Sequence, residues 1–157
     1  MESCIVKSPL GYVKIEGDSD GISSVSVLNS VERESEIIPK NLEDCVLQLH
    51  EYFGGTRTVF NLKLNPSGTS FQRQVWNALQ NIPFGKTVSY LELSKTLGNV
   101  KAIRAVANAN GKNPIWILVP CHRVVGTDGS LVGYAGGLHR KQWLLEHENP
   151  NKQQSLF

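Results

Sequence analysis

The sequence lacks several features that would place it at once in a particular class of protein. No stretch approaches 18 consecutive apolar residues, so we expect no transmembrane helix. The opening residues, MESCIVKSPLG, lack the apolar core and cleavage site of a signal peptide. Only three cysteines occur, and no two form a C-x-x-C pair, which argues against both a disulfide framework and a structural zinc site. We therefore expect a cytoplasmic protein (nuclear in a eukaryote) without membrane association, metal or cofactor.

The charge is small in sum but unevenly distributed along the chain. The apolar fraction of 40% and the charged fraction of 19% are typical of a globular protein with a real core. Residues 1–65 carry six Lys/Arg against ten Asp/Glu, whereas residues 66–157 carry ten against four. This predicts two lobes, 1–65 and 66–157, of which the basic second lobe meets a polyanion. A similar surplus is also common on surfaces that bind nothing.

The first lobe has the pattern of a small α/β unit. Strands are expected within residues 3–8, 11–18 and 22–29, which are joined by Gly, Pro and Asp turns. Apolar residues then recur with helical spacing from Leu42 to Phe53, with Asn41 as a candidate N-cap. A last strand is expected over residues 58–64.

The second lobe is predicted to be mostly helical, which makes the whole chain an α+β protein. Two capping boxes, Thr69 with Gln72 and Ser89 with Glu92, each precede an apolar pattern with helical spacing. The first of these helices would turn Phe71 inward together with Val75, Trp76 and Leu79. A third helix over residues 100–109 would follow the second after a glycine-containing turn, which predicts a helix-turn-helix.

The third helix has an unusual composition, KAIRAVANAN. Alanine stands at positions 102, 105, 107 and 109, and beyond the first turn Arg104 is the only long polar side chain. Alanine-rich segments are often simply good helices. Alternatively, small residues allow another surface to approach the backbone closely, and DNA would suit such a face.

The stretch VPCHRVV, residues 119–125, places a histidine directly after a cysteine. A free thiol with a pKa near 8.5 is only about 3% ionised at pH 7, and a neighbouring imidazole could take its proton. Lowering the thiol pKa by about 2 to 3 units would make the thiolate the major form. Either Glu146 or Glu148 remains available to orient His122, and spacing does not choose between them. The competing interpretation of Cys121 is a buried, inert thiol.

Four segments together resemble one known family. In order and spacing, VPCHRVV, FQRQVWNALQNIPFGKTVSYLELSKTLGN, IRAVANANGKNPIWILVPCHRVVG and GYAGGLHRKQWLLEHE are similar to the O6-alkylguanine-DNA alkyltransferases. The resemblance covers about Phe71 to Glu148, and the first lobe resembles the family's ribonuclease-H-like domain only in its pattern of elements. The chain departs from the common pattern at Ala107 and Ala135, and the zinc site of some members has no counterpart here.

The resemblance implies a role for each residue of the reacting site. Cys121 would attack the alkyl carbon on O6, His122 would receive the thiol proton through a water, and Glu148 would orient His122. Tyr90 would donate to the departing guanine, and the Asn113 side chain would tie backbone together near the thiol. The substrate pocket would be formed by Val124, Leu131, Tyr134, Ala135, Gly136 and Lys141. Pro120 and Arg123 would be structural, the arginine by bridging nearby backbone.

The resemblance also implies how DNA is bound. Double-stranded DNA bearing O6-alkylguanine would be held through its minor groove by a monomer, with Lys101, Ala102, Ala105 and Arg104 in contact. Arg104 would fill the space left by the flipped nucleotide. One molecule would repair one lesion irreversibly, and O4-alkylthymine is expected as a further substrate. The alternatives are a DNA-binding module that recognises lesions without repair, which the presence of Cys121 disfavours, and a cysteine hydrolase, which would regenerate its thiol.

Overall fold

The computed structural model describes residues 1–131, 134 and 136–150, and the chain divides into two compact units. The first unit contains Met1–Ser67 together with Pro114–Leu118, and the second contains Gly68–Asn113 and the chain from Val119 onward. From the sequence alone, residues 114–118 were expected to lie in the second lobe. They join the first because Ile115 pairs with Val25, with hydrogen bonds from Val25 N to Pro114 O and from Trp116 N to Val25 O.

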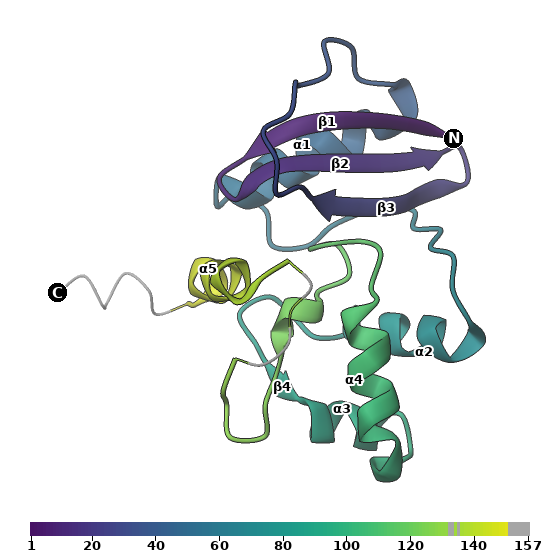
Figure 1. Ribbon diagram of the computed structural model, residues 1–157, viewed down its shortest axis with the longest axis vertical. Helices are drawn as coiled ribbons and strands as arrows, with labels where there is room; N and C mark the ends of the chain where they lie inside the picture. Colours follow the sequence, from purple (N-terminus) through teal and green to yellow (C-terminus); the bar gives the residue numbers. More distant parts are fainter. Residues whose placement is uncertain (132–133, 135, 151–157) are drawn as a thin grey trace, which may run out of the picture. The chain divides into compact units, whose positions relative to one another are not determined.

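The first unit is built on a three-stranded antiparallel sheet in the order β1-β2-β3 (Figure 1). The strands are β1 (Glu2–Ser8), β2 (Gly11–Asp18) and β3 (Gly21–Val27), which confirms the three strands expected from the sequence. Alternate residues of β2, Val13, Ile15 and Gly17, are buried, as the period of a strand requires. Gly21 opens β3 with a φ of 129°, in a region that side chains rarely adopt.

Helix α1 (Glu43–Phe53) of the first unit packs against this sheet. After a 3-10 turn, η1 (Lys40–Leu42), helix α1 buries Cys45, Leu49 and Tyr52. The assignment of Asn41 as the N-cap is wrong, because Leu42 occupies that position and no side chain caps it. The Asn41 amide instead donates to Glu2 Oε1 at 2.7 Å, a contact from far along the chain.

The strand expected over residues 58–64 is also wrong. Of residues 58–64, only Leu64 pairs with the sheet, through an isolated β-bridge to Ile22. At the centre of this stretch the backbone of Asn61 is bonded to a side chain instead of a neighbouring strand, since Asn61 N donates to Gln48 Oε1 and Asn61 O accepts from Gln48 Nε2. A buried glutamine on α1 thus replaces the pairing that the apolar pattern suggested.

The segment from residue 114 to 118 contains a strained turn. Ile117 has a φ of 70°, and Leu118 N donates to Trp116 O at 2.8 Å across it. This is a γ-turn of the rare kind, and positive φ is costly for a β-branched residue. The turn is held because Ile117 is only 1% exposed, so apolar burial opposes any relaxation of the backbone.

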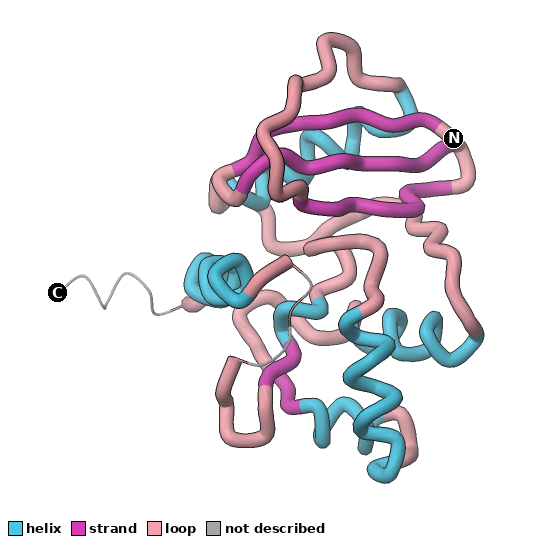
Figure 2. The backbone as a smooth tube through the Cα atoms, in the orientation of Figure 1, coloured by secondary structure: helices cyan, strands magenta, loops and turns pink. Residues whose placement is uncertain are grey.

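The second unit is mostly helical, as expected (Figure 2). Its helices are α2 (Ser70–Leu79), α3 (Tyr90–Thr96), α4 (Ile103–Gly111) and α5 (Leu138–Glu148), with the 3-10 turns η2 (Val100–Ala102) and η3 (Cys121–Arg123). Both predicted capping boxes are present, and α3 and α4 form the helix-turn-helix pair. The predicted inward face of α2 is correct for Val75, Trp76 and Leu79, whereas Phe71 is 37% exposed.

Two short strands and one buried side chain tie these helices together. Strand β4 (Val88–Ser89) pairs in parallel with β5 (Val124–Val125), which places the start of α3 beside the segment that follows η3. The Trp76 indole, 2% exposed, donates to Ala109 O at 2.9 Å and so links α2 to α4. The β4–β5 pairing therefore fixes the segment that contains Cys121 to the start of the helix-turn-helix.

Replacing Gly68 with alanine is expected to destabilise the protein. A Cβ at Gly68 would lie 2.5 Å from Trp76 Cη2, too close for a ring packed in the core. We expect Gly68→Ala to lower the free energy of unfolding by about 1–3 kcal/mol, as overpacking does. Urea denaturation measures this change. Gly111→Ala is the matched control, because a Cβ there meets nothing within 4 Å; equal stabilities of the two variants would contradict the packing argument.

Candidate active site

Cys121 is presented by a tight turn centred on Pro120. Cys121 N donates to Val119 O at 2.8 Å, and Pro120 has φ −82° and ψ 66°, which are the values of an inverse γ-turn. The side chain of Asn113 donates to the same Val119 oxygen at 2.7 Å. The structure thus places Asn113 where it ties the two ends of the loop together. Proline suits this turn because its ring already fixes φ.

The thiol itself is buried and surrounded by polar groups. Cys121 is 8% exposed. Burial raises the pKa of its thiol, although hydrogen bonds with the side chains of Asn113 and Tyr134 and the charge of Lys141 lower it. The pKa of the thiol is therefore not lowered in the protein without substrate, and the thiolate is not its major form. Desolvation outweighs the neighbouring groups that favour the thiolate.

A carboxylate at the end of α5 binds the two residues that follow Cys121. His122 Nε2 lies 2.7 Å from Glu148 Oε2, and Arg123 donates from Nε to Glu148 Oε1 at 2.8 Å and from Nη2 to Oε2 at 3.0 Å. All three side chains are buried. Between the two acids that spacing left open, the structure brings Glu148 to His122, whereas Glu146 is exposed and accepts from Gln142.

Electrostatics explains why a carboxylate is stable in this position. Burial would raise the pKa of Glu148, but the hydrogen bonds and charges of His122 and Arg123 lower it to about 2. Glu148 is also the last residue of α5, where the helix dipole disfavours an anion. The bidentate guanidinium compensates for both effects. The carboxylate is therefore ionised at neutral pH.

Arg123 connects this ion pair to a second loop. Its Nη1 donates to Ile82 O at 2.6 Å, and its guanidinium lies 5.9 Å from the centre of the Phe84 ring. The prediction that Arg123 bridges nearby backbone is confirmed by the first contact. Sequence reasoning missed its bond to Glu148, although an arginine beside a histidine in a segment without acids is a signal that a distant carboxylate serves both.

The ionisation of Glu148 determines the tautomer of His122. An ionised carboxylate only accepts hydrogen bonds, so Nε2 must carry the proton that it donates to Glu148. Burial lowers the pKa of His122, against the hydrogen bond and charge of Glu148, which raise it. The ring is thus neutral and its Nδ1 keeps a lone pair. Nδ1 is buried and has no hydrogen-bond partner within the described residues.

Tyr90 lies at the start of α3, near the thiol. It is partly buried, and burial raises its pKa, as does the charge of Cys121, while a hydrogen bond from Asn110 lowers it. That bond runs from Asn110 Nδ2 to Tyr90 Oη at 3.4 Å. Asn110, near the end of α4, was not singled out in the sequence, because an asparagine close to a helix end is usually a cap or a turn residue.

The predicted pocket residues lie on β5, on α5 and on the loop between them. Val124 is buried in β5, Leu131, Tyr134 and Gly136 are partly buried, and Ala135 lies outside the described residues. Lys141 is 0% exposed and is therefore no solvated lysine; its Nζ lies 5.9 Å from the centre of the Tyr134 ring. Burial lowers the pKa of Lys141, although the charge of Cys121 raises it.

The predicted DNA-binding residues form a separate, solvent-facing group. Lys101, Arg104 and Ala105 are exposed, and Ala102 is partly exposed, on η2 and α4. The structure does not bring them into the buried cluster around Cys121. This arrangement leaves the second helix of the helix-turn-helix with a small-residue surface from which a single arginine projects.

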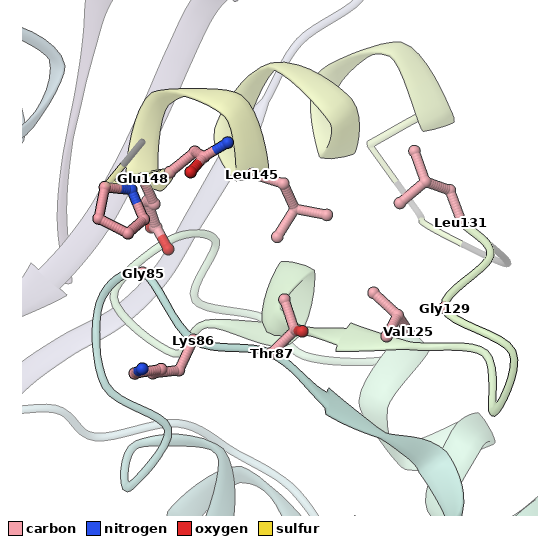
Figure 3. A pocket seen from close by; sticks show the side chains of 10 residues that line it. Gly85, Lys86, Thr87, Val125, Gly129, Leu131, Leu145 and Glu148 are labelled. Carbon is pink, nitrogen blue, oxygen red and sulfur yellow. The ribbon is translucent and has the colours of Figure 1, made fainter. Parts of the chain in front are cut away.

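A cavity of about 250 Å³ lies on the other side of β5 (Figure 3). Val125, Leu131 and Leu145 face into it, together with the loop around Lys86, and Glu148 lies at one end. Cys121 does not line it, and of the two residues of β5 only Val125 does. Within residues 1–131, 134 and 136–150, no cluster of three or more His, Cys, Asp or Glu could hold a metal ion, and no helix is long and apolar enough to cross a membrane.

Comparison with known families matches both halves of the chain. The model of the 6-O-methylguanine DNA methyltransferase DNA-binding domain matches residues 70–150, and that of its ribonuclease-like domain matches residues 4–66. A solved structure from Methanococcus jannaschii, an O6-methylguanine DNA methyltransferase, has a TM-score of 0.66 at 26% identity and covers 94% of this chain and 93% of that one.

Nearer relatives cover almost the whole length. The methylated-DNA–protein-cysteine methyltransferase of Methanosarcina acetivorans is 44% identical over 154 residues, 94% of this chain and 98% of that protein. The crystal structure of Mycobacterium tuberculosis OGT in complex with DNA is 42% identical with a TM-score of 0.83, over 92% of this chain and 91% of that one. On the evidence of both domain models and these relatives, the chain belongs to the 6-O-methylguanine DNA methyltransferase family.

Proposed function

We propose that this protein repairs double-stranded DNA by transferring the alkyl group of O6-alkylguanine to its own Cys121. The observation that carries the proposal is a free cysteine fixed on a rigid turn, next to a neutral histidine whose other nitrogen is held by an ionised glutamate. The printed names of the relatives, methylated-DNA–protein-cysteine methyltransferase, and the DNA in one homologous crystal structure support it.

The transfer is a displacement at the alkyl carbon. The Cys121 thiol gives its proton through a water to His122 Nδ1, and the resulting imidazolium is stabilised by Glu148. The thiolate sulfur then forms a bond to the alkyl carbon while the carbon–O6 bond breaks, and the bonding electron pair remains on the guanine. Tyr90 donates a hydrogen bond to the departing base, and the base anion takes up one proton, equivalent to the one that His122 received and returned through water, to become ordinary guanine.

The raised pKa of the thiol fits this order of events. Because burial favours the neutral thiol, the proton must leave as the substrate occupies the site rather than beforehand. The product is a thioether, which has no acidic proton and a poor leaving group. One molecule therefore repairs one lesion, and the same chemistry extends to O4-alkylthymine.

DNA binding is assigned to η2 and α4. The exposed surface around Ala102 and Ala105 enters the minor groove, with Lys101 near the phosphates, and a single monomer suffices. The Arg104 side chain occupies the gap in the base stack of the DNA once the alkylated nucleotide has rotated out toward Cys121. The second lobe of the sequence, with ten Lys/Arg against four Asp/Glu, has the charge that such binding needs.

Mass spectrometry of the intact protein tests the proposed reaction. After incubation with duplex DNA containing O6-methylguanine, the protein should gain one methyl group in place of one hydrogen, located on Cys121. A second portion of damaged DNA should add nothing. Cys121→Ser should remain unmodified, and Cys45→Ser, which changes a buried thiol of the first unit, should still be methylated. Regeneration of the free thiol would indicate a hydrolase, and bound DNA without methylation would indicate a silent recognition module.

Replacing Arg104 with alanine should separate base flipping from chemistry. Flipping costs a few kcal/mol, so loss of the side chain that fills the stack should slow repair of duplex O6-methylguanine on the order of tenfold. The rate with free O6-benzylguanine, which needs no flipping, should change little. Arg73→Ala removes the same charge from an exposed position on α2 and should leave both rates unchanged. Equal losses of Arg104→Ala on both substrates would contradict the flipping role.

Replacing Glu148 with glutamine should cost stability in a pH-dependent manner. Its pKa of about 2 in the folded protein lies below the ordinary 4.5, so ionised Glu148 stabilises the fold above pH 4.5, and this contribution is lost as the pH falls toward 2. Glu148→Gln should lower the free energy of unfolding by roughly 3 kcal/mol at pH 7 and by clearly less at pH 3. Denaturation at both pH values measures this.

The neighbouring glutamate provides the control. Glu146→Gln removes an exposed carboxylate from the same turn of α5, so stability at pH 7 should change by no more than about 0.5 kcal/mol. Methyl transfer to Cys121 should slow in Glu148→Gln, because His122 loses the anion that stabilises its protonated form, and should persist in Glu146→Gln. A Glu148 variant as stable as the Glu146 variant would refute the assignment.

A further inference from the structure

Helix α1 carries a groove lined mainly by apolar side chains. The helix face opposite its buried residues contributes four residues to the groove, and the loop before the helix contributes a fifth: Glu43, Val46, Leu47, His50 and Ile38. The volume of the groove is about 340 Å³. Leu47 is 57% exposed, and Ile37, beside Ile38 in the loop, is 85% exposed. Apolar side chains that gather at one place on a surface indicate an interaction site, whereas isolated ones do not.

Carboxylates border the exposed leucine of this groove. Glu43 and Asp44 lie one helical turn before Leu47, so both are its neighbours on the surface of α1. Glu51 lies one turn after Leu47 and is paired with Arg57 at 2.9 Å. Glu43 and Asp44 are exposed, and neither forms an ion pair with another residue that the structure describes. The groove therefore combines an apolar floor with negative charge that no cation compensates.

This charge decides which kind of molecule the groove suits. The phosphates of nucleic acids and of anionic lipids would be repelled by Glu43 and Asp44. Two copies of the groove placed face to face would also bring like charges together. A cationic segment with apolar side chains satisfies both parts of the surface. The first lobe as a whole, residues 1–65, has ten Asp/Glu against six Lys/Arg, so its field attracts such a segment.

We propose that the groove on α1 binds an amphipathic segment of a partner protein, in which leucine-type side chains on one face are flanked by lysine or arginine. The apolar side chains of the segment pack on Val46 and Leu47, and its cations lie beside Glu43 and Asp44. In recognition of this kind, apolar anchors supply the affinity and charge supplies the selectivity. The groove lies wholly within the first unit, so this binding is a function separate from alkyl transfer and does not rest on it.

Three synthetic peptides test this surface. The first is a helix-forming peptide with leucine on one face and lysine on the others. The second has glutamate in place of lysine, and the third has glutamine in place of leucine. Each peptide carries a fluorophore, and its binding to the full chain is followed by fluorescence anisotropy. Leu47→Ala removes the exposed apolar side chain of the groove, and Val59→Ala is the control, because Val59 is 72% exposed in the same unit and does not line the groove.

The expected result is selective binding of the first peptide. Its Kd should be lower than those of the other two by about tenfold, because only it offers both apolar anchors and cations. Leu47→Ala should weaken this binding about tenfold, as truncation of a central anchor does, and Val59→Ala should leave it unchanged. Glu43→Gln combined with Asp44→Asn should bring the Kd values of the lysine and glutamate peptides together and make binding less sensitive to salt. Thermal unfolding verifies that each variant is folded.

Other results would overturn the proposal. Equal binding of the lysine and glutamate peptides would remove the role of charge, and binding that Leu47→Ala leaves unchanged would place the peptide elsewhere on the protein. Analytical ultracentrifugation of the protein alone, and of the protein with undamaged duplex DNA, tests the other occupants. Self-association or DNA binding that Leu47→Ala weakens and Val59→Ala does not would assign the groove to a second copy or to DNA instead of a basic segment of another protein.

Discussion

The site depends on one buried carboxylate shared between a histidine and an arginine. Glu148 binds both residues that follow the thiol, so the position of Cys121 is fixed on its C-terminal side by an ion pair. On its N-terminal side, the Pro120 turn and the Asn113 amide meet at a single carbonyl oxygen, that of Val119. Because the carboxylate stays ionised, it also dictates which nitrogen of His122 carries a proton. The position of the Cys121 loop and the protonation of His122 thus both depend on the Glu148 carboxylate.

Burial acts on each titratable group of this cluster. It raises the pKa of Cys121 and lowers those of His122 and Lys141, which in each case favours the uncharged form. Glu148 is the exception, because the hydrogen bonds and charges of His122 and Arg123 outweigh its desolvation. The resting site therefore combines a permanent ion pair with a thiol and an imidazole that are both neutral. In the proposed reaction, charge appears on these two groups only when a substrate is present.

The sequence predicted the local features well and the long-range ones poorly. The capping boxes of α2 and α3 involve residues three positions apart, so their pattern is visible in one short window. Asn41 and the strand over residues 58–64 failed because Glu2 and Gln48, distant in sequence, satisfied the polar groups instead. The bond between Arg123 and Glu148 escaped notice for the same reason. Cys121 and His122 were candidates because they are adjacent in the sequence, whereas their roles and the choice of Glu148 came from a family resemblance, since spacing left two glutamates open.

The interleaved chain has a consequence for biosynthesis. The first unit includes Pro114–Leu118, so its sheet cannot be finished when residue 67 leaves the ribosome. At ordinary translation rates, the missing segment follows roughly 3 to 10 s later. During this interval the edge of β3 is without its partner and must be kept from pairing with other nascent chains. The strained Ile117 turn can close only after that delay, and the loop that follows it is fixed later still, because His122 and Arg123 lack their carboxylate until Glu148 has been synthesised.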